Sequence, residues 1–304
     1  MSSDCERRSD VITLQKCTCD IQINRKEEKE MKMKEKSVLA GFVCMVALTL
    51  FAPGVVWAQS SPMEIDNSQR IGGLFIGVAP DYVGSSDYKL VAAPFFRYNF
   101  SNSEQYIVLR GFDLQFNVVD HPWFRIGPAL NYRFGRSKVE NDQVDEMENI
   151  DGAIEAGAFV GAEFKDKANP RQRLMLSLEF LQDISGAHKG SVTTGSIKGW
   201  LPLSRRFDFT LGLSSSYGSS DYMDTYFGVD TADSNQSGLR RFSADSGFRD
   251  VSITPGVVMH LTESWYLAGG VRYMRLVGDA EDSPVTKVGD NDQWIVGVGA
   301  AYTW

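Results

Sequence analysis

Cysteine and histidine are both scarce in this sequence, and their positions limit the chemistry it can carry out. All four cysteines lie within the first 44 of 304 residues, at Cys5, Cys17, Cys19 and Cys44. One residue separates Cys17 from Cys19, whereas redox and zinc CxxC motifs have two. The three histidines stand far apart in the chain. The sequence therefore predicts no metal site and no cofactor, and residues 45–304 cannot depend on a disulfide.

Excess basic charge and long apolar runs are also lacking. The net charge is −8, the isoelectric point is near 5.0, and no basic patch stands apart from the acidic residues, which argues against nucleic-acid binding. A helical membrane protein with several spans would need several uncharged stretches of about twenty residues, and only residues 38–57 form one. With 43% hydrophobic and 23% charged residues, the composition also excludes general disorder.

The one uncharged stretch is typical of an export signal. Lys32, Lys34 and Lys36 precede it, Pro53-Gly54 interrupts it, and Val56-Trp57-Ala58 resembles a signal-peptidase site. We predict that residues 1–58 are an N-terminal extension plus a signal peptide cleaved after Ala58. An uncleaved anchor helix is the alternative, and translation could also begin at Met31 or Met33.

Residues 59–304 show the two-residue period of β-strands. From Trp294 to Trp304 the even positions are apolar or aromatic, and the odd positions are mostly small or polar. Segments of about ten residues with aromatic ends favour a transmembrane barrel over a soluble sandwich. In this interpretation Val298 faces lipid and Gly299 faces the lumen.

We therefore predict one domain, an all-β antiparallel outer-membrane barrel of about twelve strands. The expected strands are 70–79, 88–100, 104–110, 111–118, 123–134, 151–164, 172–182, 190–201, 206–216, 248–261, 264–276 and 291–304. With both termini periplasmic, the periplasmic turns are short and most outer loops are long, as in known barrels. The region 104–118 barely provides two spanning strands, so ten strands is the alternative.

Several short motifs, in order along the chain, resemble the MipA/OmpV family of outer-membrane proteins, named for MltA-interacting protein. They are Asp81, Tyr82, Gly84, Asp87 and Tyr88 after the first strand, Tyr226, Phe227, Gly228 and Val229 in the longest loop, and Asp279, Ala280, Asp282, Ser283 and Pro284 near the end. Gly127-Pro128 and Tyr132–Gly135 frame the fifth strand. The resemblance extends over residues 66–304.

This resemblance implies a scaffold without enzymatic activity. The family's namesake links a murein-degrading lytic transglycosylase to a penicillin-binding synthase of peptidoglycan. Other members are discussed as adhesins or stress-response proteins, and a small pore or uptake channel is a further alternative.

The residues themselves give no sign of catalysis. No GxSxG, HExxH or phosphate-loop motif occurs. His121 is expected in a periplasmic turn, His188 in an outer loop and His260 on the lumen face near a strand end, so they cannot act together. We predict that the protein is not an enzyme.

Two sets of charged residues could serve binding or transport. The expected lumen set is Arg97, Arg125, Arg133, Glu155, Glu163, Glu179, Asp208 and Arg272. Mutual pairing is the simpler explanation for it, because isolated buried charges are costly, and a selective pore is the alternative. Basic residues in two periplasmic turns, Lys165, Lys167, Arg171, Arg205 and Arg206, could contact acidic partners in the periplasm. The acidic outer loops are either simply solvated or bridged by divalent cations to lipopolysaccharide.

Overall fold

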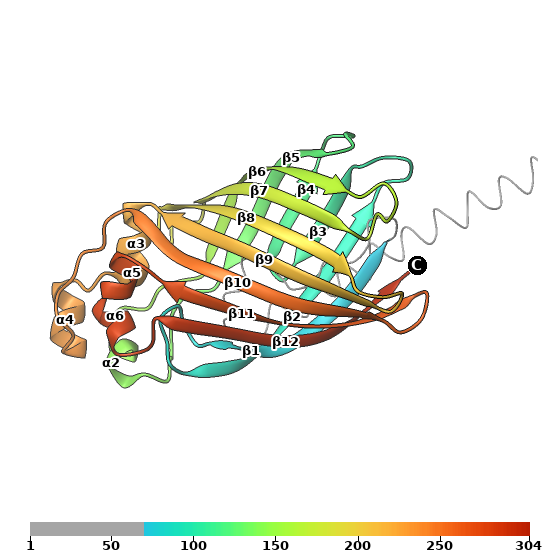
Figure 1. The fold of residues 1–304 in the computed structure, drawn as a ribbon. Coiled ribbons are helices and arrows are strands. Elements are labelled where there is room, and N and C mark those ends of the chain that lie inside the picture. Colours follow the sequence, from blue (N-terminus) through green and yellow to red (C-terminus); the bar gives the residue numbers. More distant parts are fainter. Residues whose placement is uncertain (1–69) are drawn as a thin grey trace, which may run out of the picture. The chain divides into compact units, whose positions relative to one another are not determined.

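Residues 70–304 are described by the computed structural model, and they form a closed antiparallel barrel of twelve strands (Figure 1). Neighbouring strands follow chain order, and β1 pairs with β12 to close the barrel. The strands are β1 (Ile71–Pro80), β2 (Tyr88–Asn99), β3 (Tyr106–Arg110), β4 (Asp113–Asn117), β5 (Phe124–Arg133), β6 (Ala153–Lys165), β7 (Arg173–Asp183), β8 (Ser191–Pro202), β9 (Phe207–Gly218), β10 (Gly247–His260), β11 (Trp265–Leu276) and β12 (Asp292–Thr303). The fold class and the number of strands are confirmed.

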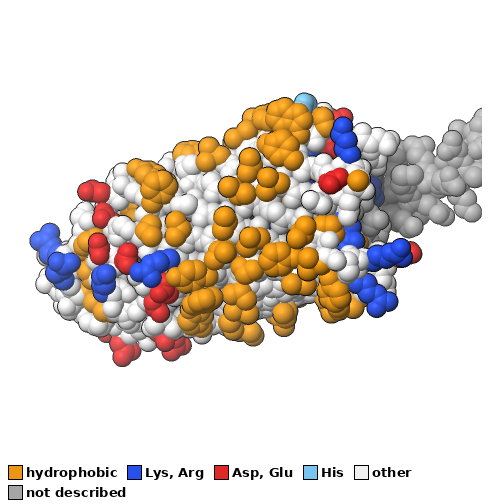
Figure 2. Space-filling view, in the orientation of Figure 1, with side chains coloured by type: hydrophobic (Ala, Val, Ile, Leu, Met, Phe, Trp, Pro, Cys, Tyr) orange, Lys and Arg blue, Asp and Glu red, His pale blue; other side chains and the backbone are white. Residues whose placement is uncertain are grey.

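The alternation in the sequence decides which side chains face outward. On β12, Trp294, Val296 and Val298 are 42–59% exposed, whereas Gln293 and Thr303 are at most 3% exposed. Val298 therefore lies on the outer surface, and Gly299 lies on the opposite face beside the Phe75 ring. Apolar side chains form a broad band on the outer wall, between two charged ends (Figure 2). This is the arrangement that a bilayer requires of a barrel.

The two ends of the barrel differ strongly. At one end, called here the turn end, short connections join the strands at 100–105, 118–123, 166–172, 203–206 and 261–264. At the other, called here the loop end, the connections 134–152, 219–246 and 277–291 are much longer. The C-terminus lies at the turn end (Figure 1). This asymmetry is the one predicted from the sequence.

The wall is incomplete beside the β3–β4 hairpin. Each of its strands has five residues, fewer than the roughly nine to eleven needed to cross a bilayer. β2 pairs with β3 only from Phe95 to Asn99. Within the described residues, the half of β2 toward the loop end therefore pairs with β1 alone. Pro94 lies where the pairing with β3 stops, and a proline has no N–H to leave unsatisfied there. The barrel thus has twelve strands, but two of them do not span it.

Short helices in the loops close the loop end, and the sequence interpretation missed them. They are α2 (Asp142–Asp145), α3 (Ser220–Phe227), α4 (Thr231–Ser237), α5 (Asp279–Asp282) and α6 (Pro284–Lys287). Helices of four to eight residues are too short to show a 3.6-residue period, so the sequence contained no sign of them. Within residues 70–304, every helix is too short or too polar to be a membrane span.

The predicted export signal, the cleavage after Ala58 and the N-terminal extension all lie outside the described residues. They stay predictions.

Candidate functional site

All eight charged residues expected in the lumen are buried inside the barrel, at 0–9% exposure. Near the turn end, Arg125 Nη2 lies 2.7 Å from Glu163 Oε2 and 2.8 Å from Glu104 Oε2. Lys165 Nζ extends this cluster to Glu104 at 2.9 Å. Because Arg125 comes from β5 and Glu163 from β6, the ion pairs join neighbouring strands across the inner face of the wall.

A second cluster is centred on Glu155, near the loop end. Its carboxylate accepts hydrogen bonds from Arg133 Nε at 2.7 Å, Arg133 Nη2 at 3.0 Å and Asn131 Nδ2 at 2.6 Å. His188 Nε2 lies 3.0 Å from the same carboxylate, and His188 Nδ1 accepts the Gly190 N–H. The histidine therefore carries its proton on Nε2 and donates it to Glu155. All members of this cluster are at most 3% exposed.

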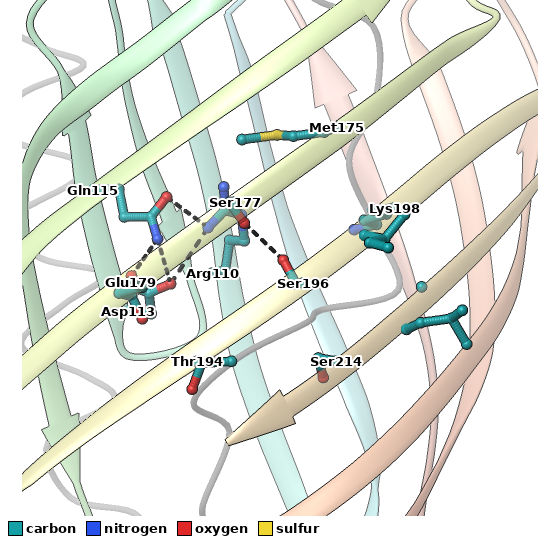
Figure 3. Close-up of a pocket in the computed structure, with 13 residues that line it drawn as sticks. Arg110, Asp113, Gln115, Met175, Ser177, Glu179, Thr194, Ser196, Lys198 and Ser214 are labelled. Atoms are coloured by element: carbon teal, nitrogen blue, oxygen red, sulfur yellow. Dashed lines mark hydrogen bonds and ion pairs between the residues drawn. The ribbon is translucent and has the colours of Figure 1, made fainter. Parts of the chain in front are cut away.

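Between these clusters the lumen holds a small polar pocket of about 70 Å³ (Figure 3). Glu179 accepts a hydrogen bond from Gln115, and Arg110 Nη1 donates to both Gln115 and Asp113. Ser177 Oγ and Ser196 Oγ are 2.7 Å apart across β7 and β8. A space of this size holds a few water molecules, because a water needs at least about 10–15 Å³ of such volume.

The lumen charges that the sequence analysis missed include an adjacent pair on β10. Arg249 and Asp250 are consecutive on β10, yet both are buried, at 4% and 0% exposure. The pairing with β9 shifts register between Phe248 and Asp250, and such a bulge lets two successive side chains face inward. Arg272 Nη2 lies 3.9 Å from Asp250 Oδ1. In the sequence, the bulge could have been suspected because two opposite charges, Arg249 and Asp250, stand side by side where a strand should alternate.

Helix α3 places an aromatic plug in the mouth of the loop end. Tyr222, Met223 and Phe227 are 0–1% exposed. The Tyr222 hydroxyl accepts a hydrogen bond from Arg249 on β10, and Arg133 on β5 lies over its ring, with Cζ 5.1 Å from the ring centre. Four strands separate β5 from β10 in the barrel order. Tyr222 thus bridges separate parts of the wall and fills the mouth.

The motif residues that carry the family resemblance meet in this cap. Tyr82 and Val229 share an apolar cluster with Val285 of α6, and Phe227 shares another with Ala280 of α5. Ser283 Oγ donates to the Phe227 carbonyl at 2.6 Å, which ties two of the motifs together. Gly84 has φ +102° and packs against Thr286, so a side chain there would be strained. The motifs build the cap itself, and most of their side chains face its interior.

The basic residues predicted at the turn end divide into two groups. Lys165 is held by Glu104, and Arg171 pairs with Asp208 while its Nη2 donates to the Ser204 carbonyl at 3.1 Å. Lys167, Arg205 and Arg206 are exposed.

The two groups have different uses. Arg171 joins the 166–172 turn to the 203–206 turn, so its charge serves the fold. The three exposed side chains are available to a partner.

The three histidines of residues 70–304 all have hydrogen-bond partners within the fold. His121 accepts the Phe124 N–H in a turn, His188 belongs to the Glu155 cluster, and His260 Nε2 lies 2.7 Å from Asp208 Oδ2 at the turn end. None of the three has a serine or cysteine nucleophile among its hydrogen-bond partners. Among residues 70–304, no group of three His, Cys, Asp or Glu side chains could hold a metal ion.

Comparison with known proteins gives a family and a general likeness of fold. The family model described as MltA-interacting protein MipA matches residues 72–304. No curated protein matches the chain.

Solved structures that align with the chain include the NanC porin, with 11% identity, a TM-score of 0.45 and coverage of 77% of this chain and 100% of that one. An outer membrane channel from Pseudomonas putida F1 aligns with 7% identity, a TM-score of 0.44 and coverage of 81% and 99%. OmpT of Vibrio cholerae aligns with 9% identity, a TM-score of 0.35 and coverage of 80% and 99%.

Proposed function

This chain belongs to the MltA-interacting protein MipA family, and from that premise we propose that it is a scaffold that binds murein enzymes. Its partners would be the lytic transglycosylase that gives the family its name and a penicillin-binding synthase of peptidoglycan. The barrel would hold them at the periplasmic face of the outer membrane, and no chemistry of its own would be involved.

The observation that carries this proposal is the organisation of the turn end. Arg171 links the 166–172 turn to the 203–206 turn through Asp208 and the Ser204 carbonyl. Lys167 lies in the first turn, and Arg205 and Arg206 lie in the second. Basic side chains are visible at this end of the barrel (Figure 2). Two turns fixed to each other present positive charge without having to be ordered on binding, which favours association with an acidic partner.

The interior of the barrel supports binding over transport. Tyr222 and its neighbours fill the loop-end mouth, and the ion pairs of Arg125 and Arg133 fill part of the lumen. A conducting pore would need a continuous polar path through these groups.

Charge reversal at the turn end tests the scaffold. We expect Lys167→Glu, Arg205→Glu and Arg206→Glu together to reduce co-purification with the lytic transglycosylase several-fold, most strongly at low salt, because exposed charges act mainly on encounter. A matched control reverses three exposed charges at the loop end, Lys138, Arg240 and Lys287, and should leave capture unchanged. Heat-modifiable migration checks that both variants are folded.

Two results would contradict the proposal. If the variant captures as much lytic transglycosylase as the wild type does, these turns do not contribute to binding. Failure of the wild type to capture either enzyme under mild crosslinking would remove the scaffold itself. If the wild type then shows steady ion-selective openings in planar bilayers, a channel would be the favoured function.

A further inference from the structure

A pocket of about 950 Å³ lies among three loops at the loop end, opposite the basic turns. Its walls come from the connections 134–152, 184–190 and 219–246. This volume is within the range of pockets that hold small organic ligands. The pocket takes no part in the scaffold proposal.

The rim of the pocket is mostly acidic. Six carboxylates line it, those of Glu148, Asp151, Asp221, Asp224, Asp230 and Asp233, against the basic side chains of Arg136, Lys189 and Arg241. Some of the carboxylates have structural roles: Asp230 Oδ1 accepts the Asp233 N–H, and Asp233 Oδ1 accepts the Glu148 N–H, both at 2.8 Å. The excess of negative charge would attract a cation, but an acidic rim alone does not define a ligand.

Arg136 is the second and independent feature. It lines the pocket and is only 6% exposed. Its Nη1 donates to the Tyr226 carbonyl at 3.2 Å, and its Nη2 lies 4.0 Å from Met147 Sδ. Its Nε has no hydrogen-bond partner, and no carboxylate of the described residues makes an ion pair with it. Burial lowers the pKa of Arg136, and the opposing charge of Asp233 on the rim only partly offsets that effect.

Two other buried arginines of the barrel have a carboxylate directly beside them. Arg125 and Arg133 each lie 2.7 Å from a carboxylate oxygen. A buried cation without such a partner is costly, and an anion from a ligand would remove that cost.

We propose that this pocket binds a small zwitterion of short-peptide size, with its carboxylate on Arg136 and its ammonium group on the acidic rim. A simple anion would satisfy Arg136 but would be repelled by the carboxylates. A simple cation would meet the rim but leave Arg136 without its partner. Only a ligand with both charges matches both features of the site.

Three forms of one peptide test this on the purified full-length mature barrel by isothermal titration calorimetry. Trialanine has both charges, its N-acetyl form has only the carboxylate, and its C-terminal amide has only the ammonium group. We expect trialanine to bind at up to millimolar concentration, and each blocked form to bind at least tenfold more weakly. Loss of one charge-assisted contact of about 1.5–3 kcal/mol corresponds to that factor or more.

Variants locate the binding. Arg136→Gln should weaken trialanine binding at least tenfold, and Arg136→Lys should retain part of it because the charge remains. Asp221 is exposed, and Asp221→Asn does not threaten the fold, so it should weaken trialanine binding without changing heat-modifiable migration. Glu140→Gln, an exposed loop-end change outside the pocket, serves as the matched control.

The proposal is wrong if trialanine shows no binding at millimolar concentration. It is also wrong if either blocked form binds as well as trialanine, or if Asp221→Asn and Arg136→Gln bind like the control. None of these results depends on whether the turn end binds a murein enzyme.

Discussion

Removal of the Glu155 carboxylate should destabilise the barrel far more than a change at an exposed loop residue. Four hydrogen bonds of 2.6–3.0 Å converge on this group from Asn131, Arg133 and His188. Glu155→Ala would leave the Arg133 guanidinium at 2% exposure without its anion. Removing one partner of a buried ion pair costs about 3–5 kcal/mol, mostly because the other charge stays buried and unpaired. We expect the free energy of unfolding to fall by that amount.

Urea titration of the refolded barrel in lipid vesicles measures this, with the folded fraction read from heat-modifiable migration. Glu140→Ala, an exposed loop-end change, is the control and should lie within about 0.5 kcal/mol of the wild type. The double variant Arg133→Met with Glu155→Leu should recover most of the loss, since apolar replacement of both partners is often neutral.

The reasoning would be refuted by a loss below about 1 kcal/mol for Glu155→Ala, the size of an ordinary hydrogen bond. It would also fail if the double variant were no more stable than Glu155→Ala alone. In that case lost packing, and not the unpaired arginine, would explain the effect.

Four further predictions follow from the wall, the cap and the export signal. Val298→Arg places a charge on the lipid face and should cost about 2–4 kcal/mol near the midplane, seen as lost heat-modifiable migration. Gly299→Val should block closure of the barrel, because a Cβ there would lie 2.5 Å from a backbone oxygen of β1, whereas Gly195→Ala meets nothing within 4 Å and should assemble normally. Burial raises the pKa of Tyr82 to about 12, whereas an unfolded chain has about 10. Stability from Tyr82 is therefore complete below about pH 10 and is lost as the pH rises toward 12, so Tyr82→Phe should reduce the alkaline loss measured by urea titration. The mature protein should begin at Gln59, and mass-spectrometric detection of residues 38–57 in the outer-membrane form would exclude this.

The sequence by itself determined the barrel, because strand alternation is a local property. Each outward side chain such as Val298 meets lipid, and each inward neighbour meets the lumen, whatever the rest of the chain does. All twelve predicted strands occur, and their bounds differ from the observed ones by at most two residues. The same local reading also placed the eight lumen charges inside the wall.

Only the tertiary structure decided what closes the barrel and which charges remain free. The α3 plug depends on contacts of Tyr222 with β5 and β10, which lie far apart in sequence and have no shared local signal. The bulge in β10 overrides strict alternation and turns Arg249 inward. Lys165 and Arg171 look the same as Lys167 in the sequence, and only the folded turns show that the first two are held in ion pairs. The sequence also could not show that Arg136 is buried without an ion-pair partner. Its surroundings come from three loops that meet only in the folded barrel.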